Sequence, residues 1–349
     1  MPITIKNTAG GGVTLDSTTS ANETVNLPTG GGNLITTTGA TFTGNIATKG
    51  ISAITLGTSN FVAGVNAGNS IVSGGNYNTT VGDEAGTAIT TGDDNTTLGY
   101  SAGASITTGS QNIAVGNYSM DQGTVTGSGN IAIGRLSMRA LTSGDNNVAV
   151  GITSLNANTT GATNTAVGSS AMQVNTTGGA NVAVGYQALD ANTTGDTNTA
   201  VGKAAMTTNT TGSRNTGIGL ASLNANTTGS EGTAVGYVAL YNNTTGPHNT
   251  AVGFAALYTN TTGQQNTAIG QNALLSATTA NYNSVLGKNA GSSITTGASN
   301  TIIGYRAGVS GEALTTGGRN TFIGANVHGQ ATGSAVSYTH LTLPTKRIV

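Results

Sequence analysis

The chain has 349 residues, of which 55 are glycine and only 7% are charged; it contains no cysteine, and its formal net charge is −1. The lack of cysteine excludes a disulfide framework and a thiolate metal site. The near-zero net charge argues against electrostatic binding to nucleic acid or to an anionic membrane. No run approaches the roughly 18 apolar residues of a membrane span, and residues 1–6 lack the pattern of a secretory signal, so we expect no membrane insertion.

Residues 1–50 do not follow the repeat that governs the rest of the chain. Short stretches of Ile, Val, Leu and Thr at residues 3–5, 13–15 and 34–36 predict brief strands, with a glycine turn at residues 30–32. We interpret residues 1–50 as an N-terminal β attachment or collar segment. Residues 51–73, around the sequence Phe-Val-Ala-Gly, are interpreted as degenerate transition coils.

From residue 74 to residue 335 one unit recurs: Asn-Thr-Ala-Val-Gly, two variable residues, Ala-Leu or Ala-Met, then Asn-Thr-Thr-Gly. Looser matches give fifteen copies, ending in glycines from Gly82 to Gly324, with one step of 18 residues and one of 20 among steps of 17. The best-conforming copies begin and end their strand motif at Asn164 and Gly168, Asn181 and Gly185, Asn198 and Gly202, Asn215 and Gly219, Asn249 and Gly253, and Asn266 and Gly270. Self-similarity at a fixed period is the mark of a stacked architecture.

Seventeen residues are too few for a helix pair or a propeller blade, and no unit holds a helix-length stretch free of turn signals. Each unit therefore predicts one coil of an elongated, all-β parallel β-solenoid or β-roll, about 70 Å long at 4.8 Å per coil. We expect an inward ladder of the Val or Ile before each glycine, an inward Leu/Met ladder, hydrogen-bonded stacked asparagines and left-handed glycine corners. Like charges stacked one coil apart would repel by about 3–4 kcal/mol, which explains the low charge content.

No residue pattern predicts catalysis, a metal site or a cofactor site. The three histidines are His248, His328 and His340, and none has the spacing of a metal cage or of a Ser-His-Asp arrangement. Two carboxylate pairs, Asp83 with Glu84 and Asp93 with Asp94, could bind Ca²⁺ or hydrolyse a glycan. We favour solvated turns for both pairs. The Asn-Thr-Thr triplets are glycosylation acceptors only in a secreted eukaryotic protein.

Aromatic side chains gather at two positions of the repeat. The residue after the motif glycine is aromatic in five coils, and the position four residues further on is Tyr241 in one coil and Tyr258 in the next. We predict that Tyr237, Tyr241, Phe254 and Tyr258 lie on neighbouring coils, with His248 in the intervening loop. These rings are candidate receptor contacts, because tyrosine stacks on sugars and anchors protein surfaces. The alternative that we favour is packing between protomers or across a coil corner.

The last fourteen residues, 336–349, fit neither pattern. Their sequence, V-S-Y-T-H-L-T-L-P-T-K-R-I-V, resembles a sequencing adapter read in one frame, a scar of assembly from environmental DNA. We therefore expect residues 336–349 not to be native and the natural C-terminal part to be missing beyond Ala335. The alternative is an ordinary disordered tail.

The repeat resembles those of bacteriophage tail-fibre proteins. Residues 181–189 and 192–195 match their N-T-A-V-G-Y-Q-A-L and N-T-T-G units closely, and residues 14–16 and 26–37 resemble their entry segments. The resemblance implies a homotrimeric structural and receptor-binding shaft in a virion tail. It also implies attachment to a host cell-surface glycan or protein and contact with other tail proteins through the N-terminal segment. Many such fibres end in an endosialidase-type intramolecular chaperone, which is absent here.

Two other hypotheses about the function remain open. The unit is similar to the N-S-V-A-I-G repeat of trimeric autotransporter adhesin heads, which have a shorter period and are found on the bacterial cell surface. An ice-binding solenoid is the third reading, because threonine ladders on a flat face can order water. Such faces favour Thr-x-Thr, whereas Thr193 and Thr194 are adjacent.

Overall fold

The computed structural model describes residues 6–7, 13–14, 57–309, 315–327 and 337–339, and these residues contain strands and turns but no helix. The chain divides into two units, Met1–Ile46 and Ala47–Val349. In the first unit, β1 (Lys6–Asn7) pairs with β2 (Val13–Thr14) in antiparallel fashion. The rest of the expected N-terminal collar lies outside the described residues.

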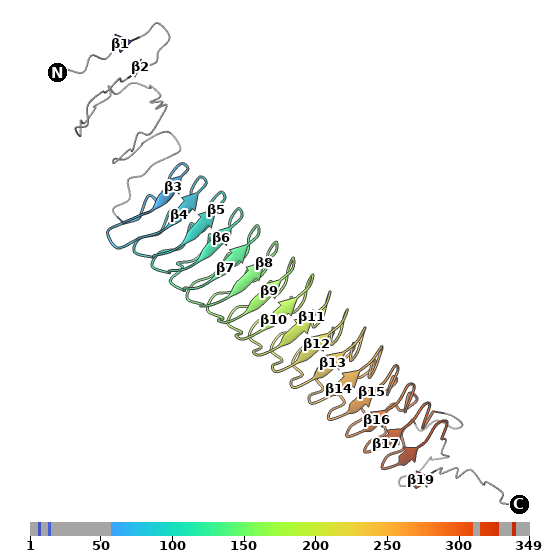
Figure 1. Ribbon diagram of the computed structural model, residues 1–349. Coiled ribbons are helices and arrows are strands. Elements are labelled where there is room, and N and C mark those ends of the chain that lie inside the picture. The colour runs from blue at the N-terminus through green and yellow to red at the C-terminus, as the bar shows by residue number, and fades with distance from the viewer. Residues whose placement is uncertain (1–5, 8–12, 15–56, 310–314, 328–336, 340–349) are drawn as a thin grey trace, which may run out of the picture. The chain divides into compact units, whose positions relative to one another are not determined.

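The second unit is a stack of β-strands, one per coil. Its strands are β3 (Phe61–Ala63), β4 (Thr79–Val81), β5 (Thr96–Leu98), β6 (Ile113–Val115), β7 (Ile131–Ile133), β8 (Val148–Val150), β9 (Thr165–Val167), β10 (Val182–Val184), β11 (Thr199–Val201), β12 (Thr216–Ile218), β13 (Thr233–Val235), β14 (Thr250–Val252), β15 (Thr267–Ile269), β16 (Ser284–Leu286), β17 (Thr301–Ile303), β18 (Thr321–Ile323) and β19 (Ser337–Thr339). Each strand pairs in parallel with its neighbours in the sequence (Figure 1). The described strands β3 and β19 make no contact with each other, so the sheet is an open ladder and not a barrel.

The pairing confirms the predicted β-solenoid. Residues one repeat apart are paired in register, as Thr165 is with Val182 and Val182 with Thr199. The ladder begins at β3, inside the segment interpreted as transition coils. It ends at β19, which lies within the segment expected to be an adapter scar; residues 51–56, 328–336 and 340–349 lie outside the described residues.

The expected inward ladder of Val and Ile is wrong. In β9 the middle residue, Ala166, is buried, whereas Val167 is 37% exposed. Successive residues of a strand point to opposite faces, so a three-residue strand with its middle residue inward must turn both flanking residues outward. The core column on this side is therefore mainly alanine in the central coils, and the Val and Ile column lies on the surface.

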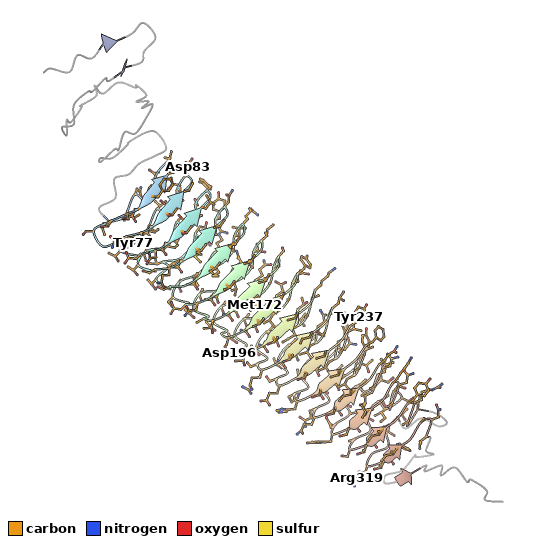
Figure 2. The ribbon with its side chains drawn as sticks, in the orientation of Figure 1. Tyr77, Asp83, Met172, Asp196, Tyr237 and Arg319 are labelled. Carbon is orange, nitrogen blue, oxygen red and sulfur yellow. The ribbon has the colours of Figure 1, made fainter. Side chains whose placement is uncertain are left out.

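The expected Leu/Met ladder is confirmed. Met172, Leu189 and Met206, on three successive coils, are fully buried and fill the space opposite the strand alanines. Figure 2 places Met172 inside the stack. Because each coil contributes only one or two large side chains and a few small ones to this core, burial has to be continuous along the stack to stabilise any single coil.

The stacked asparagines form the predicted hydrogen-bonded ladder. The backbone N–H of Asn181 donates to Oδ1 of Asn164 at 3.0 Å, and its side-chain Nδ2 donates to the same oxygen at 3.1 Å and to Gly195 O at 2.8 Å. The asparagines named in the sequence are all buried: Asn164, Asn181, Asn198, Asn215, Asn249 and Asn266. Their amides satisfy backbone groups that would otherwise be unpaired in the interior.

The motif glycines take the predicted left-handed corners. The φ angles lie between 126° and 139° at Gly168, Gly185, Gly202, Gly219, Gly253 and Gly270. A Cβ atom on Gly185 would lie 2.6 Å from the carbonyl oxygen of Gly202 in the next coil. Only glycine allows the coils to approach this closely.

Candidate functional site

The coils have two edges, which carry different side chains (Figure 2). We call the corner made by the residues directly after the motif glycine the glycine edge; Asp83 and Tyr237 mark it. We call the corner made by the two residues before the strand asparagine the asparagine edge, and Tyr77, Asp196 and Arg319 mark it. The strands run from the asparagine edge to the glycine edge.

The strand face between these edges is uncharged in every described strand from β3 to β18. Its outward columns consist of Thr, Ser, Val, Ile, Leu, Phe and Ala. Ile218 is 41% exposed and Leu286 is 50% exposed, so the apolar column on this face remains open to solvent. A contiguous exposed apolar strip of this kind marks an interaction surface.

The stacking of the coils brings the predicted aromatic residues together in pairs. The ring centroids of Tyr237 and Phe254 lie 5.5 Å apart with planes 18° apart, and those of Tyr241 and Tyr258 lie 5.3 Å apart with planes 10° apart. Tyr237 and Phe254 are about half exposed, at 50% and 49%. The prediction that these four residues lie on neighbouring coils is therefore confirmed, and the stacking follows from their identical positions one coil apart.

Stacking limits what the aromatic rings can bind. Within each pair the facing sides of the two rings cover each other, so only the outer faces and the ring edges are open to a ligand. Leu220 precedes Tyr237 in the same column, and Gln271 follows Phe254; both are exposed. A sugar can thus lie across the edges of the pair or at either end of the stack, but not between the two rings.

His248 lies in the loop between Tyr241 and Phe254, as expected, but on the edge opposite to Tyr237. It occupies the repeat position of Tyr77 and Arg319 on the asparagine edge. Its Nδ1 lies 3.0 Å from Glu231 Oε2, and the other carboxylate oxygen of Glu231 accepts a hydrogen bond of 2.7 Å from Arg214. The Arg214 hydrogen bond, and then the charges of Arg214 and His248, lower the pKa of the Glu231 carboxyl.

The two carboxylate pairs occupy different edges. Asp83 and Glu84 lie on the glycine edge, and Asp93 and Asp94 lie on the asparagine edge. Oδ1 of Asp83 and Oδ1 of Asp93 each accept a backbone N–H of the preceding coil, at 3.0 and 2.6 Å. Their positions at turns and these bonds agree with the favoured interpretation as turn residues. Among the described residues no three His, Asp or Glu side chains come together as a metal site would require.

A second asparagine column was not recognised in the sequence. Asn175 donates from Nδ2 to Asn158 Oδ1 at 2.8 Å and to Gly178 O at 2.9 Å, and it is fully buried. These are the asparagines of the Asn-Thr-Thr triplets. Because the folded coils bury them, they are not presented as glycosylation acceptors. Hydrogen-bonded amides in a core cannot be told from exposed turn residues by their spacing alone.

Comparison with known proteins adds no assignment: no protein-family model, curated protein or solved structure matches this chain. The fold defines the chain as a β-solenoid repeat protein. Within the described residues there is no helix of the length and apolarity needed to cross a bilayer.

Proposed function

We propose that this chain is the shaft of a phage-like tail fibre, and that it works as a homotrimer that holds a host-binding region away from the virion. The observation that carries the proposal is the uncharged, half-apolar strand face that continues through β3 to β18. Three copies aligned in parallel would bring identical columns together. Uncharged columns permit this alignment, because no like charges meet.

The strand face suits association for a second reason. Most coils bury alanine and one leucine or methionine, so a single stack has a thin core. Covering the exposed Val and Ile column would add apolar burial, at about 25 cal/mol per Å², in each coil. The resemblance of residues 181–189 to phage tail-fibre repeats supports the same arrangement, in which the N-terminal segment contacts other tail proteins.

The test is the solution mass of the chain and of two matched variants. We expect sedimentation equilibrium to give three times the chain mass of 34.1 kDa for the native sequence. The double variant Val184→Lys/Val201→Lys, on the strand face, should sediment as a monomer. The control Thr177→Lys/Thr194→Lys, at exposed positions outside the strands, should remain a trimer. A monomeric native chain, or a trimer that tolerates lysines on the strand face, would contradict the proposal.

The genes beside this one separate a virion fibre from a bacterial surface adhesin. Neighbouring genes for baseplate components support the tail fibre, and a neighbouring or continuous membrane-anchor gene supports the adhesin. Adsorption of the labelled trimer to host cells, with the strand-face variant as control, then tests attachment itself.

A further inference from the structure

Charge is distributed unevenly along the described coils. Up to residue 200 the carboxylates outnumber the cations; these coils hold Asp83, Glu84, Asp93, Asp94, Asp121, Asp145, Asp190 and Asp196 against Arg135 and Arg139. After residue 200 the balance of the described residues reverses; they include Lys203, Arg214, Lys288, Arg306 and Arg319 against Glu231, while Glu312 lies outside the described residues. The later coils therefore form the basic part of the stack.

Three of these cations share the glycine edge. Lys203 and Lys288 directly follow a motif glycine, and Arg306 is the second residue after one. All three are exposed, and none of them forms an ion pair with another described residue. Glu231 is the one carboxylate among the described residues of these later coils; it lies on the other edge, where it pairs with Arg214 and His248. In the part of these later coils that the structure describes, the glycine edge thus presents cations without anions.

Aromatic side chains lie between these cations. The column that follows the motif glycines contains, in order, Lys203, Leu220, Tyr237, Phe254, Gln271, Lys288 and Tyr305. Lys203 and Lys288 are five coils apart, which is about 24 Å at 4.8 Å per coil. We call Lys203, Tyr237, Phe254, Lys288 and Arg306 the basic aromatic edge.

We propose that the basic aromatic edge binds an acidic polysaccharide that runs along the stack; this inference rests on the proposed host-attachment function and names its ligand class. Carboxylates of the polymer would meet Lys203, Lys288 and Arg306. Sugar rings between them would pack on the exposed edges and outer faces of Tyr237 and Phe254. An extended polymer is required, because no compact anion spans cations that are five coils apart.

A polynucleotide fits this edge less well. Its binding strength comes from many closely spaced phosphate contacts. The basic aromatic edge offers three cations, two of which lie about 24 Å apart. Between them lie uncharged residues, which suit sugars that carry a charge only on some units.

The experiment measures binding of the whole chain to alginate, a polyuronate, at low salt, with neutral dextran of similar length as the comparison. We expect alginate to bind at least about tenfold more tightly than dextran, and to weaken as salt rises. Lys203→Gln/Lys288→Gln/Arg306→Gln should weaken alginate binding about tenfold or more. Tyr237→Ala/Phe254→Ala should weaken it about fivefold or more. The matched control on the asparagine edge, Arg214→Gln/Arg319→Gln, should change it less than about twofold.

Three results would overturn the inference: equal binding of alginate and dextran, equal loss in the control variant, or tighter binding of single-stranded poly(dT) than of alginate. Circular dichroism and sedimentation of each variant establish that it keeps its fold and mass. Failure here is distinguishable from failure of the proposed function. A chain that is trimeric and adsorbs to cells but does not bind alginate would contradict only this inference. A monomeric chain that binds alginate would contradict only the proposed fibre assembly.

Discussion

Three non-glycine positions in most coils adopt the left-handed region, in addition to the motif glycine. In the coil after β9 two of them are Ser170 and Met172, with φ of 56° and 49°, and the third is Ala180, with φ of 55°. A side chain in this region costs about 1 kcal/mol or more. The backbone N–H groups offset part of this cost: that of Ser170 donates to Ile152 O, and that of Ala180 to Ala162 O, in the neighbouring coil.

Ala180→Gly should raise the free energy of unfolding by about 0.5–1 kcal/mol, because glycine removes the left-handed penalty at an exposed position. The matched control is Ala162→Gly in the preceding coil, whose φ is ordinary. This control should lower the stability by about 0.5–1 kcal/mol, since glycine adds only unfolded-state entropy there. Urea unfolding of both variants measures the difference, and stabilisation by the control would contradict the strain argument.

Asp190 occupies a repeat position at which asparagine forms a hydrogen bond between coils elsewhere in the stack. Asn156 and Asn224, at the same repeat position, donate from Nδ2 to the carbonyl oxygens of Leu136 and Ala204, twenty residues earlier, at 2.8 and 3.0 Å. A carboxylate cannot donate, and Oδ1 of Asp190 is buried without a partner. Burial raises the pKa of the Asp190 carboxyl.

Asp190→Asn should therefore stabilise the fold by about 1–2 kcal/mol at pH 7, because the amide would donate to the carbonyl of Ser170. With a raised native pKa, the folded chain takes up a proton before the unfolded chain does. At this site the native protein thus gains stability as the pH falls through the native pKa, down to the ordinary aspartate pKa of about 3.9. The variant should lack this gain. Urea midpoints from pH 7 to pH 4 check both points; an advantage that stays constant with pH would count against them.

At the scale of one coil, two different packing arrangements build the same core. Early and late coils combine a larger middle strand residue, such as Thr97, with glycine at the position that is leucine or methionine elsewhere, here Gly103. Central coils combine Ala with Met, as Ala132 does with Met138. A Cβ atom on Gly103 would lie against Cγ2 of Thr97 and 2.9 Å from Cδ1 of Ile106, so a larger residue at position 103 would have to displace both side chains.

A double-mutant cycle on Thr97→Ala and Gly103→Met measures this complementarity. Gly103→Met alone should destabilise the fold by about 2 kcal/mol or more through overpacking, and Thr97→Ala alone by about 1 kcal/mol through a cavity. The double variant should recover part of this loss, with a coupling energy of about 1 kcal/mol, because Ile106 and the φ of 63° at residue 103 still oppose the methionine. Additive effects would show that the two side chains do not share one volume.

The repeat period carried most of what the sequence could reveal about the coil. It fixed the parallel register, the Asn164 ladder, the corner at Gly168 and the proximity of Tyr237 to Phe254, because in a stacked fold equal repeat positions become neighbours. It could not fix which face of a three-residue strand is inward, and the Val167 column was therefore assigned to the wrong face. Both assignments satisfy an alternation of period two over so short a strand.

Neither the left-handed backbone positions nor the burial of the Asn175 column could be predicted from the sequence. At left-handed positions one expects glycine or asparagine, yet Ala180 and Met172 stand there. Contacts between coils impose that conformation, and local sequence preference does not. The change from acidic to basic coils near residue 200 is visible in the sequence. Which of these charges share an edge could be learned only from the structure.

At the scale of the whole stack, each coil is held only by the coils on either side of it. Stability in such an array is a sum of coil and interface terms, so one broken interface affects its neighbours first. Gly185→Ala should break one, because its Cβ would lie 2.6 Å from the backbone oxygen of Gly202 and its φ of 136° excludes alanine. We expect a loss of about 3 kcal/mol or more.

Hydrogen exchange locates that loss. Amides of β10 and β11, on either side of the broken interface, should exchange faster, while those of β4 and β17 should change little. The control Gly179→Ala has an ordinary φ, its Cβ would lie 3.2 Å from the nearest atom, Ala162 O, and alanine already occupies the same repeat position at residue 162. It should leave exchange near native rates. Uniformly faster exchange from β4 to β17 in Gly185→Ala would mean that the stack unfolds as one cooperative unit, and that its coils do not act as separable elements.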